Sequence, residues 1–257
     1  MLDESNRALG RYRERRVLVT GAGGGLGSVI CERLAAEGAR LIAADLPGAA
    51  LDSALDGLPD GDHLAVALDV SDEDAWRAAV DRVEAELGGL DVLVNNAAIG
   101  SLKTVEDEDR EHWDQVMSVD ATGVWMGMKH AGPLIERSGG GAIVNVASIL
   151  GSTGGLGNSV AYHAAKGAVR TMTKNAALHW ATRGVRVNSL HPGFIETAQL
   201  LERYGGSERH RAMVANTPMG RLGRPAEIAG AVAFLGSDDA GYMTGAELYA
   251  DGGWTAR

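Results

Sequence analysis

The feature that most constrains this chain is an alternation of short apolar runs with longer segments of helical period. Continuous apolar runs suit strands that are buried on both faces, and parallel strands need crossover segments long enough to hold a helix. The alternation therefore predicts an α/β fold with a doubly wound parallel sheet of about seven strands and helices on both of its faces. The predicted strands are 16–20, 40–45, 63–69, 90–95, 142–147, 185–191 and 247–250.

No linker, low-complexity tract or internal repeat divides the sequence. We expect an N-terminal arm at 1–15, with a solvated basic stretch at 11–16, and a single domain at 16–257. The polar stretch 194–218 is longer than a usual connection, so it is interpreted as a lid over a ligand, a surface excursion being the alternative. The predicted helices are 25–37, 72–87, 107–136, 161–182 and 226–235, with a weaker one at 49–55.

Composition narrows the function classes. With 257 residues, 45% of them hydrophobic, the chain can form a sizeable core. A formal net charge of -10 leaves no broad basic face, which argues against nucleic-acid and membrane partners. The single cysteine, Cys31, is expected to be a small buried hydrophobe. Without an apolar leader or a run of about 18 uncharged apolar residues, the chain is expected to be cytoplasmic.

Glycines gather between the first predicted strand and the first predicted helix, in TGAGGGLG. A helix N-terminus offers unpaired N–H groups and a partial positive charge, which hold an anion if the backbone comes close to it. Gly21 falls at the turn, Gly25 and Leu26 at the closest approach, and Gly27 where the helix packs on the strand. Alone, such a turn indicates only nucleotide binding, and a plain tight turn is the alternative.

Asp45 ends the second predicted strand, about 20 positions after the glycine turn. A carboxylate at this place can accept hydrogen bonds from both hydroxyls of an adenosine ribose, and it repels a 2′-phosphate. Leu46 follows it rather than a base, and the glycine turn contains no Arg or Lys. These residues favour NAD over NADP; the alternative is that Asp45 merely starts the turn before Pro47.

Tyr162 and Lys166 lie one helical turn apart in AYHAAKGAVR, and Ser148 ends the preceding apolar run GAIVNVAS. Parallel sheets bind ligands at the carboxyl ends of their strands, where Ser148 is expected. A phenol with a pKa of about 10 is a poor base at neutral pH, and an ammonium beside it favours the phenolate. The tyrosine and lysine alone would fit a surface helix, but together with Ser148 and the glycine turn they indicate a catalytic site.

Residues 16–253 resemble the short-chain dehydrogenase/reductase family, whose members have a Rossmann fold. The resemblance rests on the glycine spacing, on Tyr-x-x-x-Lys, on NNAA at 95–98 and on HPGFIET at 191–197. It implies NAD-linked hydride transfer, with Tyr162 as acid/base, Lys166 on the cofactor ribose and Ser148 on the substrate oxygen. The further cofactor contacts that it implies are Asp69, Val70, Asn96, Pro192, Gly193, Ile195 and Thr197.

Asp120 departs from the family pattern, which usually has an asparagine at this place. In the resemblance, the main-chain carbonyl of that asparagine supports a water near the lysine, and a carboxylate adds charge there. We expect Asp120 to belong to the catalytic group, where it either pairs with Lys166 through water or satisfies local helix N–H groups.

The predicted substrate wall is mainly apolar and lacks an arginine beside Ser148, which favours a neutral hydrophobic alcohol or ketone. HAAKGAVR and the ending MTGAELYADGGWTAR are similar to the branch that oxidises cyclic secondary alcohols such as cyclopentanol, cyclohexanol, terpene alcohols and steroids. Two long apolar helices, as in the family's dimers and tetramers, predict a homo-oligomer. The predicted substrate residues are Ile149, Leu150, Leu156, Asn158, Phe194, Leu200 and Tyr204.

Three other functions fit the sequence less well. A methyltransferase also uses a glycine turn followed by an acidic residue, but it has no need of Tyr-x-x-x-Lys. A non-catalytic dinucleotide-binding scaffold or redox sensor would be expected to lose the reactive tyrosine or serine, and both are present here. A metal enzyme is not indicated, because the seven histidines show no ligand spacing.

Overall fold

A seven-stranded parallel sheet forms the centre of the molecule in the computed structural model, which describes residues 10–257. The strand order is β3-β2-β1-β4-β5-β6-β7, so the chain winds outward from β1 to one edge and then from β4 to the other. The predicted fold class is confirmed. The strands are β1 (Arg16–Thr20), β2 (Arg40–Asp45), β3 (Leu64–Ala67), β4 (Val92–Asn95), β5 (Gly141–Val146), β6 (Val185–Pro192) and β7 (Glu247–Ala250).

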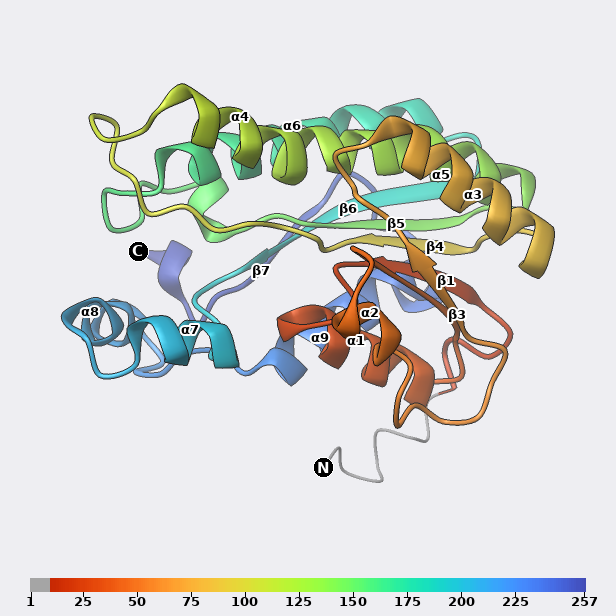
Figure 1. Ribbon diagram of the computed structural model, residues 1–257, viewed down its shortest axis with the longest axis horizontal. Helices are drawn as coiled ribbons and strands as arrows, with labels where there is room; N and C mark the ends of the chain where they lie inside the picture. Colours follow the sequence, from red (N-terminus) through yellow and green to blue (C-terminus); the bar gives the residue numbers. More distant parts are fainter. Residues whose placement is uncertain (1–9) are drawn as a thin grey trace.

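Helices cover both faces of the sheet (Figure 1). α1, α2 and α9 lie on one face, and α3, α4, α5 and α6 lie on the other. The bounds are α1 (Gly25–Ala36), α2 (Ala49–Asp52), α3 (Glu73–Leu87), α4 (Arg110–Met117), α5 (Gly123–Arg137), α6 (Val160–Trp180), α7 (Ala198–Tyr204), α8 (Glu208–Asn216) and α9 (Pro225–Gly236). Short 3-10 turns are η3 (Ile149–Gly151), η4 (Asp238–Ala240) and η5 (Trp254–Ala256).

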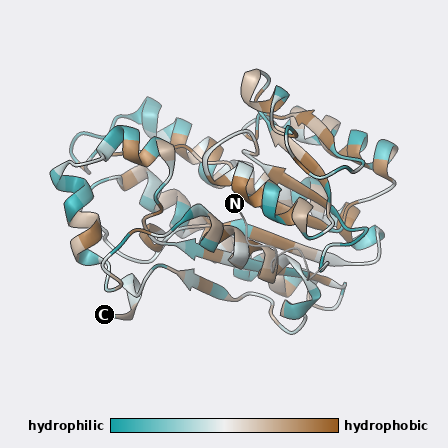
Figure 2. Ribbon diagram, turned by 90° about the horizontal axis from the view of Figure 1, so that it is seen from below, coloured by the Kyte–Doolittle hydropathy of each residue, from teal (hydrophilic) through white to brown (hydrophobic). Residues whose placement is uncertain are grey.

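Each face of the sheet has its own apolar core. On β1, Leu18 packs into the core beneath α3, α5 and α6, while Val17 and Val19 pack into the core beneath α1 and α9. All three side chains are fully buried, as is Cys31 on α1. The strands accordingly form a hydrophobic centre in Figure 2. Burial on both faces explains why the strands could be predicted from continuous apolar runs rather than from alternation.

Buried amides fix the helix that carries the predicted catalytic pair. Asn95 on β4 donates to Asn145 on β5 (2.8 Å), and Asn145 donates to Thr173 Oγ1 on α6 (2.9 Å). Asn95 and Asn145 are register partners, so the parallel pairing brings the two amides together. Breaking either of these buried hydrogen bonds would leave a polar group unpaired. The two bonds therefore oppose any slip of α6 along the sheet.

The predicted helix 107–136 is interrupted. α4 and α5 are joined by η2 (Ser118–Thr122), a turn of π-helix. A π turn inserts extra backbone into a helix without changing its hydrophobic composition, and it is often found at functional sites. The turn carries Asp120, which is completely buried.

The predicted lid, 194–218, contains two short helices rather than an irregular loop. The Thr197 side chain caps α7 by accepting from Leu200 N, and the Ser207 side chain caps α8 by accepting from His210 N. Both helices are too short and too polar to show a clear hydrophobic period. They lie beyond the carboxyl end of β6, at the left of Figure 1.

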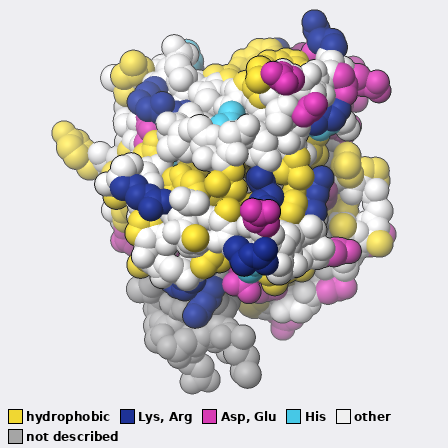
Figure 3. Space-filling view, turned by 90° about the vertical axis from the view of Figure 1, so that its left-hand side faces the viewer, with side chains coloured by type: hydrophobic (Ala, Val, Ile, Leu, Met, Phe, Trp, Pro, Cys, Tyr) yellow, Lys and Arg dark blue, Asp and Glu magenta, His cyan; other side chains and the backbone are white. Residues whose placement is uncertain are grey.

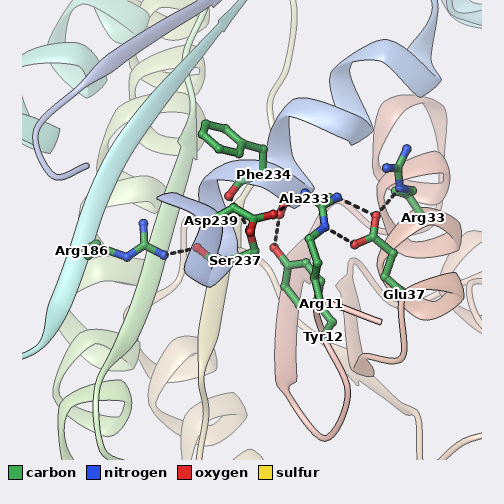
Figure 4. Close-up of polar contacts among 9 residues, drawn as sticks. All are labelled: Arg11, Tyr12, Arg33, Glu37, Arg186, Ala233, Phe234, Ser237 and Asp239. Atoms are coloured by element: carbon green, nitrogen blue, oxygen red, sulfur yellow. Dashed lines mark hydrogen bonds and ion pairs between the residues drawn. The ribbon is translucent and has the colours of Figure 1, made fainter. Parts of the chain in front are cut away.

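The basic stretch 11–16 is packed, so the prediction of a solvated segment is wrong; residues 1–9 of the predicted arm lie outside the described residues. Tyr12 is 1% exposed, and its hydroxyl donates to the Ala233 carbonyl (2.8 Å). Arg11 forms a two-pronged ion pair with buried Glu37 (Figure 4). The partners come from α1 and α9, far away in the sequence, so the local sequence gives no sign of them.

Candidate active site

A cavity of about 510 Å³ opens at the carboxyl ends of the strands. It lies where the chain leaves β1 and β4 in opposite directions, the place at which doubly wound sheets bind ligands. Figure 3 looks onto this end of the molecule, where hydrophobic side chains gather across the middle and charged ones lie among and around them. The location is the one predicted for the ends of the first, second, fourth and fifth strands.

Most of the predicted site residues line this cavity. They are Gly21, Gly25, Leu26, Gly27, Asp45, Asp69, Val70, Asn96, Ser148, Ile149, Leu150, Tyr162, Lys166, Pro192, Gly193, Phe194, Ile195, Thr197 and Leu200. The structure therefore brings together residues from six strand ends, which no local pattern could place.

Three predicted substrate residues do not line the cavity. Leu156 and Asn158 lie in the connection between η3 and α6, outside the lining. Tyr204 ends α7, and the guanidinium groups of Arg203 and Arg209 lie over its ring at 5.6 and 5.4 Å. Proximity in sequence to Ser148 and to the predicted lid was not sufficient to place these side chains in the wall.

Other residues that the sequence did not single out line the same cavity. The most informative are Ile99 after β4, Val119 on η2 and Gln199 on α7. Ile99 directly follows the NNAA segment, which is the one signal that could have found it. Val119 depends on the π turn and Gln199 on α7, neither of which was predicted.

The glycine turn is closely packed where predicted. A Cβ at Gly27 would lie 1.8 Å from the Gly21 carbonyl oxygen, and one at Gly21 would lie 2.9 Å from Ala97 Cα. Gly21 and Gly25 also have positive φ angles, 65° and 56°. At Gly24 a Cβ would meet nothing within 4 Å, so the backbone there faces open space. The turn is thus compressed toward the sheet and open toward the cavity, as a diphosphate cradle requires.

Thr20 and Asn96 hold this turn against the end of β4. Thr20 Oγ1 accepts from the backbone N–H groups of Asn96 and Ala97, both at 3.0 Å. The Asn96 amide donates to the carbonyls of Thr20 (2.9 Å) and Gly21 (3.3 Å). The side chain of Asn96 therefore supports the glycine backbone.

Asp45 lies at the far end of the cavity and is tied to the same turn. Its Oδ2 accepts from Gly23 N (2.8 Å) and its Oδ1 from Leu46 N (2.8 Å). Each carboxylate oxygen has further lone pairs, so these bonds orient the group and leave it able to accept from a diol.

Ser148, Tyr162 and Lys166 meet on the opposite side of the cavity. Ser148 follows β5, and its Oγ accepts from Leu150 N (3.1 Å). The Lys166 ammonium lies 5.4 Å from the centre of the Tyr162 ring and donates to the Val146 carbonyl (3.2 Å). Lys166 is 1% exposed, so its charge acts through little solvent.

The pKa of Tyr162 is raised above its ordinary value. Burial is the largest cause; Lys166 lowers the pKa, Asp120 raises it, and Ser148 lowers it. The expected lowering by Lys166 is therefore present but outweighed. A neutral Tyr162 is a proton donor, so the side chain as it stands favours protonating a substrate oxygen over deprotonating one.

Asp120 lies behind Lys166, outside the cavity lining. Its Oδ1 accepts from Ile99 N (2.8 Å), and its Oδ2 lies 3.6 Å from the Lys166 ammonium. Within the described residues, Oδ2 has no hydrogen-bond partner. Burial raises the pKa of Asp120, against the lowering by Lys166 and the Ile99 N–H. The carboxylate thus pairs directly with Lys166 and accepts from the N–H of Ile99, in the segment after β4, rather than from the helix N–H groups considered from the sequence.

The residues present fit a nicotinamide dinucleotide. The glycine cradle, the ribose-type acceptor Asp45 and the Tyr162–Lys166 pair follow one another along a single cavity. Across residues 10–257, His, Cys, Asp and Glu side chains form no group of three suited to a metal ion. In the same part of the chain, no helix is both long and apolar enough to cross a membrane.

Comparison with known proteins agrees with this geometry. Residues 21–255 match a family model described as enoyl-(acyl carrier protein) reductase. The chain is 43% identical over 248 residues to cis-4-hydroxycyclohexanecarboxylate dehydrogenase of Sinomonas cyclohexanicum, covering 95% of this chain and 98% of that protein. It is 39% identical to cyclopentanol dehydrogenase of Comamonas sp. (strain NCIMB 9872), covering 96% and 100%.

Solved structures give the same result. A short-chain type dehydrogenase/reductase from Mycobacterium marinum superposes with a TM-score of 0.91 at 32% identity, over 98% of this chain and 100% of that one. The chain belongs to the short-chain dehydrogenase/reductase family and is an oxidoreductase of the alcohol dehydrogenase type.

Proposed function

We propose that the protein is an NAD-dependent dehydrogenase that interconverts a neutral, hydrophobic, cyclic secondary alcohol and its ketone. The observation that carries the proposal is the single cavity in which Asp45 and the glycine turn lie at one end and Ser148 and Tyr162 at the other. Such a cavity orients a dinucleotide so that its reactive ring reaches the serine and tyrosine.

The charge of the cavity supports NAD rather than NADP. Among the described residues that line it, Lys166 is the one base, and it lies at the catalytic end beside Asp120. Asp45 and Asp69 supply negative charge at the other end. A 2′-phosphate would meet the Asp45 carboxylate with no arginine to neutralise it, whereas two ribose hydroxyls can donate to it.

The chain's own residues handle the proton. Because Ser148 Oγ accepts from Leu150 N, its hydroxyl hydrogen is available to the substrate oxygen. As the phenolate, Tyr162 accepts the alcohol proton during oxidation; as the neutral phenol, it gives that proton to the substrate oxygen during ketone reduction. Lys166 keeps a positive charge beside the ring and lies in reach of a ribose hydroxyl, and Asp120 holds the ammonium from behind. The bound nicotinamide supplies the hydride acceptor or donor.

The substrate end of the cavity is apolar. Ile99, Ile149, Leu150, Phe194 and Leu200 line it, with no arginine among the described lining residues to pair with a carboxylate. Two relatives are named for cyclic alcohols, cyclopentanol and cis-4-hydroxycyclohexanecarboxylate, which supports a cyclic substrate for this chain. Since the second of these is an anion, we expect this chain to prefer its uncharged analogues.

We also propose a lid and an oligomer. Gln199 and Leu200 on α7 line the cavity, so movement of α7 and α8 would open and close it. Trp125 on α5 and Leu178 on α6 are 45% and 80% exposed, which supports burial of these helices in a homodimer or homotetramer. Light scattering measures the oligomeric state directly. We further propose a cytoplasmic location, in keeping with a lone, buried cysteine.

The function is tested by titrating the protein with NADH and NADPH and then following absorbance at 340 nm with alcohols and ketones. We expect tighter binding of NADH and turnover of cyclopentanol or cyclohexanol above that of open-chain alcohols and 4-hydroxycyclohexanecarboxylate. An enoyl thioester is included, because the matching family model is described by that reaction. Absence of NADH binding would refute the proposal, and binding without any turnover would support the scaffold or sensor instead.

A further inference from the structure

We propose that His191 and Tyr249 are positioning residues that hold the serine loop, residues 148–152, so that the Ser148 hydroxyl faces the substrate oxygen. The proposal rests on the proposed function for the identity of the reaction. Its structural basis is a pair of contacts between this loop and the last two strands, a buried one at His191 and an exposed one at Ser152. Neither residue lines the cavity of the candidate active site.

The first contact, between His191 and Ser148, lies just beyond the point where backbone pairing between β5 and β6 ends. Backbone pairing between β5 and β6 runs as far as Val146 and Leu190, and Ala147 N donates to the Leu190 carbonyl (2.8 Å). One residue further, the His191 imidazole takes over, with its Nδ1 at 3.1 Å from the Ser148 carbonyl oxygen. The side chain thus extends the link between the two strands to the catalytic serine itself.

The chemistry of the imidazole is determined by its partners. A carbonyl oxygen only accepts, so Nδ1 carries the hydrogen. Nε2 is then the acceptor for the Ser189 hydroxyl (2.9 Å), whose single hydrogen is closer to the ring than to its other acceptor, the Ala246 carbonyl (3.3 Å). Burial lowers the pKa of His191 below its ordinary value, and the Ser148 carbonyl opposes this. The ring is completely buried and neutral, with both of its nitrogens bonded.

The second contact reaches the other end of the loop. Tyr249 is the register partner of His191 on β7, and the two rings stack with centroids 4.6 Å apart. The Tyr249 hydroxyl donates to Glu247 (2.8 Å) and is 2.8 Å from Ser152 Oγ, which therefore donates to it. One stacked pair of rings consequently holds the loop at residue 148 and at residue 152.

The stacked pair is itself anchored to α6. Glu247 accepts from Arg170 (2.8 Å) and pairs with Lys174 (2.5 Å), both on the helix that carries Tyr162 and Lys166. Burial would raise the pKa of Glu247, but these cations and Tyr249 lower it to about 2, so the carboxylate stays charged. The network joins the serine loop to the helix that carries the tyrosine, and a misplacement of about 1 Å between such groups can cost about 100-fold in rate.

A pair of nearly isosteric variants tests the first contact. His191→Asn retains an N–H donor near the position of Nδ1. His191→Leu introduces a side chain of almost the same shape as asparagine but without a donor. We expect His191→Leu to lower kcat about 30-fold or more and His191→Asn to retain at least tenfold more turnover than His191→Leu. The Kd for NADH should change less than about twofold in both, because both variants leave unchanged the glycine turn and Asp45, on other strands, and the backbone of Pro192 and Gly193 beside residue 191. Tyr249→Phe, which keeps the ring and removes the hydroxyl, should lower kcat about fivefold.

A second measurement does not depend on finding a substrate. Hydrogen exchange of the NADH-bound protein should be faster at residues 149–153 in His191→Leu than in His191→Asn, and unchanged at the glycine turn. Equal kcat and equal exchange in the two variants would overturn the proposal, as would a parallel loss of NADH affinity and kcat, which indicates general destabilisation. If the wild-type protein turns over no alcohol, the proposed function fails, and the exchange comparison still decides whether His191 holds the loop.

Discussion

Glu37 and Asp120 are both buried carboxylates, but they lie at opposite ends of the sheet and have opposite surroundings. Glu37, next to the amino end of β2, accepts from Arg11 (2.6 and 2.7 Å) and from Arg33 (2.5 Å), as Figure 4 shows. Asp120, at the carboxyl end, has one N–H at 2.8 Å and one ammonium at 3.6 Å. Neither side chain is exposed, so the difference lies in their partners.

The pKa values of the two carboxylates differ in direction because of these partners. Burial alone would raise the pKa of Glu37, but the hydrogen bonds and charges of Arg11 and Arg33 outweigh burial and lower it. At Asp120 burial prevails and the pKa is raised. A saturated carboxylate stabilises the fold and is chemically inert. An incompletely paired one keeps its capacity for other partners and changes the charge felt by its neighbours, which is typical of active sites.

The largest effect on activity is expected from a substitution of Tyr162, which should abolish most turnover without lowering the stability of the protein. Tyr162→Phe removes the group that moves the proton, and general acid–base catalysis typically contributes about 10²–10⁴-fold. We expect turnover to fall about 10³-fold, with the Kd for NADH and the melting temperature nearly unchanged. Steady-state rates with the best alcohol, together with NADH fluorescence titration, measure this. Retention of more than a few per cent of the rate would remove Tyr162 from the role of acid/base.

Glu37 should show the converse behaviour. Glu37→Gln leaves two partly buried guanidinium groups facing a neutral amide, and removal of one member of a buried ion pair typically costs about 3–5 kcal/mol. We expect the free energy of unfolding to fall by about 3 kcal/mol, measured by urea denaturation, with kcat per folded molecule unchanged. Glu84→Gln, which breaks the exposed pair with Arg137, is the matched control and should cost about 0.5 kcal/mol or less.

The sign of the pH dependence follows from the pKa of Glu37. Because this pKa is lower in the folded protein than its ordinary value of 4.5, the unfolded chain binds the proton first as pH falls. The stabilisation is therefore present above about pH 4.5 and is lost as the pH decreases toward the folded-state pKa. The free energies of unfolding of wild type and Glu37→Gln, measured against pH, should therefore converge as the pH falls through that range. Two curves that stay parallel would show that Glu37 is not the group involved.

Asp45 extends the comparison of Glu37 with Asp120 to a third carboxylate, one that is only partly buried and still has free capacity to accept hydrogen bonds. Asp45→Ala removes both acceptor oxygens and the negative charge, whereas Asp45→Asn removes the charge but keeps one oxygen, which can accept from either Gly23 N or Leu46 N. We expect the preference for NAD over NADP to decrease about 10–100-fold in Asp45→Ala, with a raised KM for NAD. A similar change in Asp45→Asn assigns the effect to repulsion of the 2′-phosphate, and an unchanged preference in both would show that the ribose is recognised elsewhere.

Several of these features follow from the sequence because their causes are local. Tyr162 and Lys166 face the same way because they are one helical turn apart, and the glycine turn has a steric requirement that is visible in residue type. The apolar runs indicated strands buried on both faces, and the strand order then brought Ser148 to the same edge as Tyr162.

The two buried carboxylates could not be predicted in this way. Glu37 finds Arg11 across 26 residues, and the basic stretch by itself is typical of a solvated segment. Asp120 reaches Lys166 because η2 interrupts the helix, and a π turn leaves the hydrophobic period of its flanks unchanged. Long-range pairing and local backbone irregularity, rather than weak propensities, set the limit of prediction here.

The smallest effect is expected at Asp120 and concerns pH rather than rate. Asp120→Asn keeps the acceptor for Ile99 N and removes the charge that partly neutralises Lys166. Burial then remains the one cause that raises the pKa of Tyr162, and Lys166 and Ser148 still lower it. The pKa of the tyrosine should therefore decrease. We expect the pH profile of kcat/KM for alcohol oxidation to move down by about one pH unit, equivalent to about 1.4 kcal/mol.

The direction of this shift distinguishes the two possible roles of the carboxylate. If Asp120 acts through its charge, oxidation gains at neutral pH while ketone reduction loses, since reduction uses the neutral phenol. If Asp120 only holds the Ile99 N–H, Asp120→Asn preserves that bond and neither profile moves. If it only keeps Lys166 in place, both directions lose rate at every pH and the Kd for NADH rises. A profile displaced to lower pH, with NADH affinity retained, would therefore mark Asp120 as the residue that adjusts the proton affinity of Tyr162, a role closed to Glu37 by its complete pairing.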